Sequence, residues 1–190
     1  MKKIFNNTLI LIMSTTTLVY LINNINIKAY FRILPCITIF PILLIPKILN
    51  KLNFKLTEIE ETLYYIFIFI AHFLGAIVNC YAKIWIFDLL AHTLSGILSF
   101  ILGLKILKMN NKEIKINLFN IIFLFGFCFL VAGSWEIIEF IGDKLLKTNF
   151  QHSIETGVND TMEDIICAFI GYTIALITYF KCNKKNYNYI

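Results

Sequence analysis

The chain has 190 residues, of which 58% are hydrophobic and 15% charged, with a formal net charge of +5. A soluble domain is about half apolar and a quarter charged, and a disordered chain is poor in apolar residues, so both classes are excluded. The positive charge does not indicate nucleic-acid binding, because the lysines lie between apolar runs of roughly 20 residues, a pattern typical of membrane proteins.

The sequence predicts an all-α fold, a polytopic membrane helical bundle that forms a single integral membrane domain over residues 1–190. The six expected spans are residues 4–22, 30–46, 63–81, 84–107, 116–141 and 162–180. Lys2 and Lys3 precede the first span and no small-residue cleavage site follows it, so we expect a retained signal-anchor helix. The second span contains Pro35 and Pro41; we expect a kinked helix, and a re-entrant segment is the alternative.

Two further features concern packing. Residues 47–62 carry apolar residues at helical spacing and predict a short amphipathic helix on the inner membrane surface. Small residues at four-residue spacing predict that the third, fourth and sixth spans pack tightly (Ala71 and Gly75; Ser95, Ser99 and Gly103; Cys167, Gly171 and Ala175). His72, in the middle of the third span, is expected to be a hydrogen-bonded bundle residue rather than a ligand.

The lysines also predict an orientation. With the N-terminus inside, 12 cationic residues fall in inner segments and 5 in outer segments. We therefore expect a multi-pass protein of the bacterial inner membrane with both termini in the cytoplasm. The acids divide the opposite way, with 8 on the outer side and 4 on the inner side. Because Asp and Glu contribute little to orientation, topology does not explain this excess of outer acids.

Three local patterns account for most of the outer acids. Asp88 and His92 lie one helical turn apart at the start of the fourth span, and Glu136 and Glu139 share a stripe at the end of the fifth. Asp160 and Asp164 lie one turn apart at the start of the sixth. The orientation brings these patterns to similar depth. The sequence therefore predicts a polar cluster that leaves a catalytic role open, comprising Asp88, His92, Glu136, Glu139, Asp160 and Asp164.

All of these except Asp160 are also candidate metal ligands (Asp88, His92, Glu136, Glu139 and Asp164), because oxygen ligands with one imidazole suit Zn²⁺, Mn²⁺ or Mg²⁺. Each residue also has a plainer interpretation. Asp160 with Glu163 fits an N-cap and capping box of the sixth span, and Asp143 fits an ion pair with Lys147. Trp135 fits an interfacial anchor, and Glu136 and Glu139 fit a solvated helix end.

The same patterns carry a family resemblance. The segment Phe87-Asp88-Leu-Leu-Ala-His92, with Gly96, resembles the Tyr-Asp-x-x-x-His-x-x-x-Gly segment of the YjdF-like inner-membrane proteins. Trp135-Glu136-Ile-Ile-Glu139 resembles that family's Tyr-Glu-Leu-Ile-Glu segment, and Asp160-Thr-Met-Glu-Asp164 its Asp-Thr-x-x-Asp segment. VanZ-like membrane proteins are a more distant likeness. The resemblance implies a multi-helix bacterial inner-membrane protein and no particular reaction.

Three functions follow from the cluster. The first is a structural or partner-binding protein in which the acids and His92 form a polar lock between the last three spans. The second is a hydrolase that uses a divalent metal ion on a lipid or cell-envelope substrate, although the chain has no H-E-x-x-H motif. The third is a cation or proton transporter, although no inverted repeat is found. The expected partner is the lipid bilayer, with no nucleic acid, and a membrane-protein partner or a homo-oligomer stays open.

Overall fold

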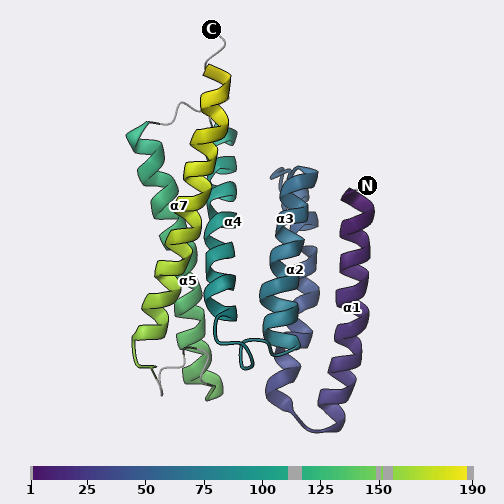
Figure 1. Ribbon diagram of the computed structural model, residues 1–190. Coiled ribbons are helices and arrows are strands. Elements are labelled where there is room, and N and C mark those ends of the chain that lie inside the picture. Colours follow the sequence, from purple (N-terminus) through teal and green to yellow (C-terminus); the bar gives the residue numbers. More distant parts are fainter. Residues whose placement is uncertain (1, 111–116, 149–150, 152–155, 188–190) are drawn as a thin grey trace. The chain divides into compact units, whose positions relative to one another are not determined.

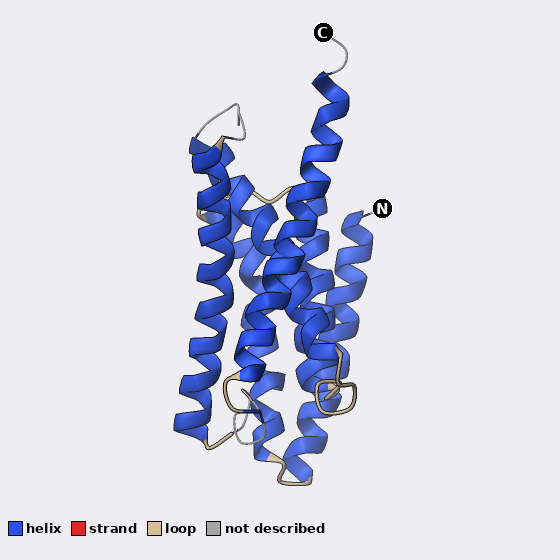
Figure 2. Ribbon diagram, turned by 60° about the vertical axis from the view of Figure 1, so that its left-hand side comes forward, coloured by secondary structure: helices blue, strands red, loops and turns tan. Residues whose placement is uncertain are grey.

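The computed structural model describes residues 2–110, 117–148, 151 and 156–187, and every regular element within these ranges is helical (Figure 2). The elements are α1 (Lys2–Asn26), η1 (Tyr30–Arg32), α2 (Ile33–Lys51), α3 (Glu58–Ile68), η2 (Phe69–Ile77), α4 (Phe87–Asn110), α5 (Leu118–Leu146) and α7 (Asn159–Tyr187). With α2 joined to η1 and α3 joined to η2, the described chain holds 6 helices long and apolar enough to cross a membrane. The helical membrane bundle is therefore confirmed, and the second span is long enough to cross.

The chain divides into two compact units, and the division lies inside α4. Unit 1 (Met1–Ala91) holds α1, α2 and α3, which alternate in direction, and η2 continues α3 (Figure 1). Unit 2 (His92–Ile190) holds α5, α7 and all of α4 beyond its first turn. The single-domain organisation expected from the sequence stays a prediction.

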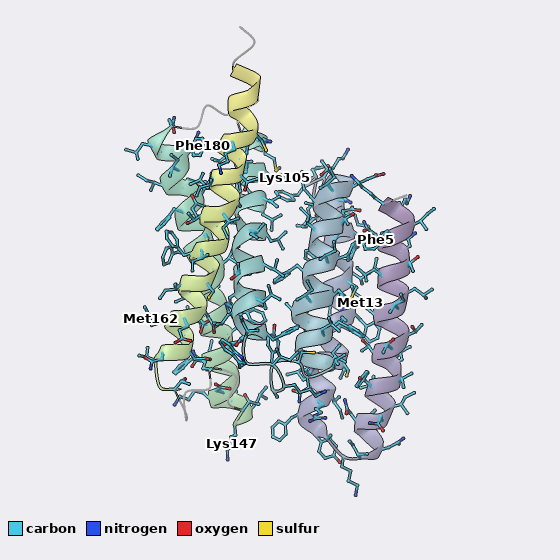
Figure 3. The ribbon with its side chains drawn as sticks, in the orientation of Figure 1. Phe5, Met13, Lys105, Lys147, Met162 and Phe180 are labelled. Atoms are coloured by element: carbon cyan, nitrogen blue, oxygen red, sulfur yellow. The ribbon has the colours of Figure 1, made fainter. Side chains whose placement is uncertain are left out.

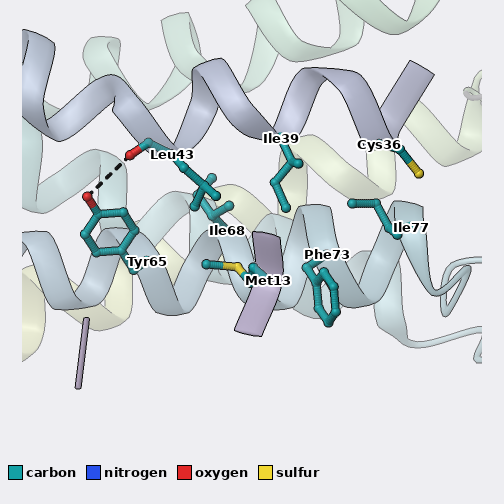
Figure 4. Packing of buried hydrophobic residues seen from close by; sticks show 8 residues of the cluster. All are labelled: Met13, Cys36, Ile39, Leu43, Tyr65, Ile68, Phe73 and Ile77. Atoms are coloured by element: carbon teal, nitrogen blue, oxygen red, sulfur yellow. Dashed lines mark hydrogen bonds between the residues drawn. The ribbon is translucent and has the colours of Figure 1, made fainter. Parts of the chain in front are cut away.

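The core of unit 1 lies where its three helices meet. Met13 of α1 is fully buried beside Ile39 and Leu43 of α2 and Ile68 of α3 (Figure 4). The Tyr65 hydroxyl donates a hydrogen bond to the Leu43 carbonyl at 3.4 Å, so that a polar contact joins α3 to α2 within the apolar cluster (Figure 4).

The turn between α2 and α3 corrects one prediction. Residues 47–62 form no separate amphipathic helix, because α2 continues to Lys51 and α3 begins at Glu58. Thr57 caps α3: its side chain accepts a hydrogen bond from the Glu60 amide, and the Glu60 carboxylate accepts one from the Thr57 amide. This Thr-x-x-Glu capping box is a sequence signature of a helix start. Asn50 stabilises the turn by donating to Glu61 at 3.1 Å.

His72 is confirmed as a hydrogen-bonded bundle residue. It lies in η2, a π-helical segment, and its Nε2 atom is 3.0 Å from the Pro35 carbonyl oxygen and 3.2 Å from the Thr38 hydroxyl. Because a carbonyl oxygen only accepts, Nε2 carries the proton of this contact. The imidazole therefore joins η2 to α2.

Unit 2 is packed around aromatic side chains and two glycines. Phe100 of α4 contacts the ring of Tyr172 of α7, and the Tyr172 hydroxyl donates to the Ile121 carbonyl of α5 at 3.3 Å. A Cβ atom at Gly96 would overlap the backbone carbonyl of Ala168, and one at Gly171 would overlap that of Thr93. Helices α4 and α7 therefore approach backbone to backbone, and only glycine fits at both positions.

The small-residue prediction is confirmed for α4 and α7 and is wrong in its details. The close approach uses Gly96, which lies outside the predicted stripe of Ser95, Ser99 and Gly103. Gly75 of the third span faces the Tyr81 ring inside unit 1. The spacing of small residues indicates that a close approach exists, but it does not specify which partner is met.

Candidate functional site

The first part of the site is the start of α4. Asp88 lies in the first helical turn and is half-buried, and His92 follows one turn later with 6% of its surface exposed. Residues four apart on a helix share a face, so the two side chains are neighbours by helix geometry alone. The division between the units falls within this helix, which carries Asp88 and His92 together as one continuous element.

The second part is the start of α7. This helix begins at Asn159, and Asp164 lies in its second turn with 2% of its surface exposed. The Asp164 Oδ2 atom is 3.6 Å from His92 Nε2. That distance is within reach of an ion pair but longer than a hydrogen bond, which spans about 2.7–3.2 Å. The structure thus brings His92 of the fourth span beside Asp164 of the sixth, and their common depth in a membrane stays a prediction.

The glycine crossing explains why the pair is so deeply buried. Gly96 lies one turn after His92, and Gly171 lies about two turns after Asp164. Because the two backbones touch at these glycines, the adjacent turns are held close, and little room is left for solvent around the imidazole and the carboxylate. The site therefore depends on the packing of α4 against α7.

Asp88, His92 and Asp164 together form the polar triad, the name used below for these three residues. Each offers one ligand atom, and the three atoms lie within 4.8 Å of one another. One imidazole nitrogen and two carboxylate oxygens form a donor set that suits zinc or manganese. The triad is thus three of the five metal ligands expected from the sequence.

The two glutamates of α5 lie outside the triad. Glu136 is buried, with 5% of its surface exposed, whereas Glu139 is half-buried. The Trp135 indole nitrogen donates a hydrogen bond to the Glu139 carboxylate at 2.8 Å, one turn along the same helix. Within unit 2, α4 begins, α5 ends and α7 begins at the same end, so the glutamates share the triad's level (Figure 1).

Asp160 and Asp143 have different surroundings from those expected. Because α7 begins at Asn159, Asp160 lies inside the first turn rather than at the N-cap position. There its charge stabilises the helix through the positive end of the helix dipole. The Asp143 carboxylate accepts hydrogen bonds from the Thr148 hydroxyl at 2.7 Å and from the Gln151 amide at 3.1 Å.

Gln151 is a site residue that sequence reasoning missed. Its side-chain amide donates to the Glu136 carbonyl of α5 at 3.3 Å and to the Thr161 hydroxyl of α7 at 3.2 Å. A single polar residue thereby joins the two helices beside the acidic cluster. No local signal marks it, because an isolated glutamine between two helices is ordinary loop composition.

The comparisons with known proteins give a family and no activity. No curated protein matches the chain, and no solved structure matches it. A family model with the description "Predicted membrane protein (DUF2238)" matches residues 5–185, which include all six spans nearly in full and every residue of the polar triad. The chain therefore belongs to the DUF2238 family of predicted membrane proteins.

Proposed function

We propose that the chain is a structural or partner-binding protein of the membrane, in which the polar triad acts as a lock between α4 and α7. The observation that carries this proposal is the pair His92 and Asp164, whose Nε2 and Oδ2 atoms are 3.6 Å apart with both residues almost fully buried. The lock would fix the end of unit 2 at which Gln151 joins α5 to α7.

Energetics support pairing between the two side chains. Burying a carboxylate in a membrane protein is costly: the upper limit, reached at the bilayer centre, is roughly 2.5–3.5 kcal/mol on insertion scales, compared with a domain's stability of about 5–15 kcal/mol. The polar imidazole of His92, 3.6 Å away, offsets part of this cost. A paired Asp164 therefore stabilises the fold, whereas an unpaired buried carboxylate would destabilise it. Neutralising Asp164 should therefore lower the stability of the fold if the residue is paired, and raise it if the residue is unpaired.

The test is a double-mutant cycle on protein purified in detergent. Asp164→Asn and His92→Gln should each lower the midpoint of thermal unfolding, because each leaves a buried polar partner uncompensated. The coupling free energy should be about 0.6–1.7 kcal/mol, the range of side-chain pairs in membrane bundles. At about 2–4 °C per kcal/mol for a chain of this length, the coupling is measurable.

Glu163→Gln is the matched control, since Glu163 precedes Asp164 on the same helix, carries the same charge and is exposed. Its midpoint should stay within about 2 °C of the wild type, because exposed substitutions change stability by less than about 0.5 kcal/mol. A midpoint raised by Asp164→Asn, or a coupling of zero, would contradict the lock.

We propose further that the protein lies in a bacterial inner membrane with both termini in the cytoplasm. The support is the excess of lysines in the segments that this orientation places inside. The triad then lies near the outer face. The resemblance to the YjdF-like proteins agrees with this location, and a membrane-protein partner or a second copy of the chain would meet the locked outer end.

The positions of the ligand atoms favour a second candidate function, a hydrolase that uses a divalent metal ion. Two ligands of a tetrahedral zinc, each about 2.1 Å from the metal, lie about 3.4 Å apart. The 3.6 Å between His92 Nε2 and Asp164 Oδ2 is near that value, and Asp88 would supply a third ligand. A metal held there would activate water against a lipid or cell-envelope substrate.

Elemental analysis of the purified protein, with and without a chelator, tests the second candidate. A metal site predicts stoichiometric zinc or manganese in the wild type and its loss in the double variant Asp88→Asn/Asp164→Asn. It also predicts that the chelator lowers the wild-type unfolding midpoint. If the two proteins had equal metal contents and the chelator had no effect, the metal site would be contradicted, and the polar lock without a metal would remain.

A further inference from the structure

The charges of unit 2 are segregated between its two ends. Lys105 and Phe180 lie toward one end of the unit, and Lys147 and Met162 lie toward the other (Figure 3). The described acids of unit 2 belong to the second end, where α5 finishes and α7 begins. Between Thr93 and Asn110 of α4, and between Ile165 and Tyr187 of α7, the sequence contains no Asp or Glu. The first end is therefore basic.

Five lysines of the described helices lie at this basic end: Lys105 and Lys108 of α4, and Lys181, Lys184 and Lys185 of α7. Lys108 and Lys181 are exposed, and each stands beside an exposed apolar side chain, Met109 at 56% and Phe180 at 39%. Cationic side chains next to exposed apolar ones are typical of the level where acyl chains give way to headgroups.

Helix ends account for only part of this pattern. A lysine in the last turn of a helix stabilises the negative end of the helix dipole, and Lys108 has this position in α4. Lys181, however, lies six residues before the end of α7, so it precedes the last turn of that helix. The topology signal explains why the lysines were placed on one side, but it acts during insertion and gives the exposed charges no role in the folded protein.

We propose that the basic end of unit 2 binds the headgroups of anionic phospholipids. The sequence strengthens the charge argument, because residues 105–115 and 181–185 hold seven lysines and one glutamate. Clusters of four to eight basic residues directly beside a membrane helix are typical of anionic-lipid recognition. Lipid phosphates contact the exposed Lys108 and Lys181, and the acyl chains cover the exposed apolar side chains Met109 and Phe180. This proposal does not depend on the polar triad.

The test is lipid retention by the full-length protein, measured by native mass spectrometry after detergent exchange with equal amounts of phosphatidylglycerol and phosphatidylcholine. The wild type should retain phosphatidylglycerol preferentially, and 0.5 M salt should reduce that preference because salt screens exposed charges. The double variant Lys108→Gln/Lys181→Gln should bind phosphatidylglycerol about 30-fold more weakly at low salt, the combined effect of two lysines at an anionic surface.

The matched control is Lys144→Gln/Lys147→Gln, which removes two exposed lysines from the opposite end of the same unit. It should retain phosphatidylglycerol as the wild type does. Equal loss in both variants, or no preference in the wild type, overturns the proposal. Inorganic phosphate at 10 mM serves as the second arm: if it displaces the lipid completely, the end binds phosphate rather than a lipid headgroup and the proposal fails.

Discussion

Pro46 lies inside α2 and has no N–H group, so the Ile42 carbonyl four residues earlier loses its usual helical donor. In a bilayer no water replaces that donor, and an unsatisfied carbonyl is costly. The Tyr64 hydroxyl of α3 donates to the Ile42 carbonyl at 2.7 Å. A side chain of the neighbouring helix thus satisfies the backbone group that the proline leaves open, and this explains why α2 tolerates an internal proline.

Tyr64→Phe should therefore destabilise the protein by about 0.6–1.7 kcal/mol, since it removes the hydroxyl and keeps the ring. The loss should shrink in a Pro46→Ala background, because the new alanine supplies an N–H group and the Ile42 carbonyl regains a helical partner. The measurement is the midpoint of thermal unfolding in detergent for the four proteins of this cycle.

Tyr20→Phe is the control, because Tyr20 packs against the same core and no hydrogen bond of its hydroxyl is found within the described chain. It should change the midpoint by less than Tyr64→Phe. An equal cost of Tyr64→Phe in both backgrounds would show that the hydroxyl does not compensate for the proline.

At the scale of helices, two glycines distinguish the effect of a close helix–helix contact from the effect of helix propensity. Gly171 of α7 meets the Thr93 carbonyl, and a methyl group there would force α4 and α7 apart. Gly171→Ala should cost about 1–3 kcal/mol, the usual cost of overpacking, and should also weaken the His92–Asp164 contact near the crossing. The unfolding midpoint and the coupling of the His92–Asp164 cycle, measured in the Gly171→Ala background, check both effects.

Gly133 of α5 supplies the comparison, because an added Cβ atom there has no neighbour within 4 Å. Gly133→Ala should be neutral or slightly stabilising, since alanine favours a helix over glycine by up to about 1 kcal/mol. If both alanine variants gave the same change, the α4–α7 crossing would not depend on backbone contact.

Long apolar runs explain why the six helices could be predicted from the sequence. Their ends were less predictable: α1 continues through a polar Asn-rich segment to Asn26, and α5 continues past Glu139 to Leu146. Helical hydrogen bonds do not stop where hydrophobicity stops. The π-helical η2 was not predictable, because residues 69–77 contain no local signal for a wider helix.

The candidate site was likewise predictable only in part from the sequence. Spacing placed Asp88 beside His92, and topology brought Asp164 to the same level, so the triad was within reach of sequence reasoning. The rotation of α5 about its own axis could not be predicted. Its apolar residues lie on all sides of the helix, so the sequence does not show which side of the helix, and hence of Glu136 and Glu139, faces the triad. The bridge that Gln151 forms from α5 to α7 depends on that rotation, whereas the contact of Trp135 with Glu139 follows from their spacing of four residues on one helix.

At the scale of the molecule, the asymmetry of charge is the feature that depends on the membrane. Within unit 2 the exposed lysines Lys108 and Lys147 lie at opposite ends, where α4 and α5 finish. If the basic end faces the cytoplasm, as the lysine distribution predicts, the polar triad lies at the end of unit 2 that is nearer the outer compartment. The orientation therefore decides which solvent and which partners the triad can meet.

Cysteine accessibility measures this orientation directly. In a chain with Cys80 and Cys182 changed to serine, Lys147→Cys should react with a membrane-impermeant maleimide in intact spheroplasts, because the proposed orientation places it on the outer side. Lys108→Cys should react only after permeabilisation, because the proposed orientation places it on the inner side. The remaining cysteines are buried or half-buried and should stay unlabelled. Labelling of both positions before permeabilisation would indicate leaky membranes, and the reversed pattern would place the triad on the cytoplasmic side and contradict the charge argument. Because the two substitutions are exposed and remove the same charge, a difference in labelling reports the side of the membrane rather than a difference in folding.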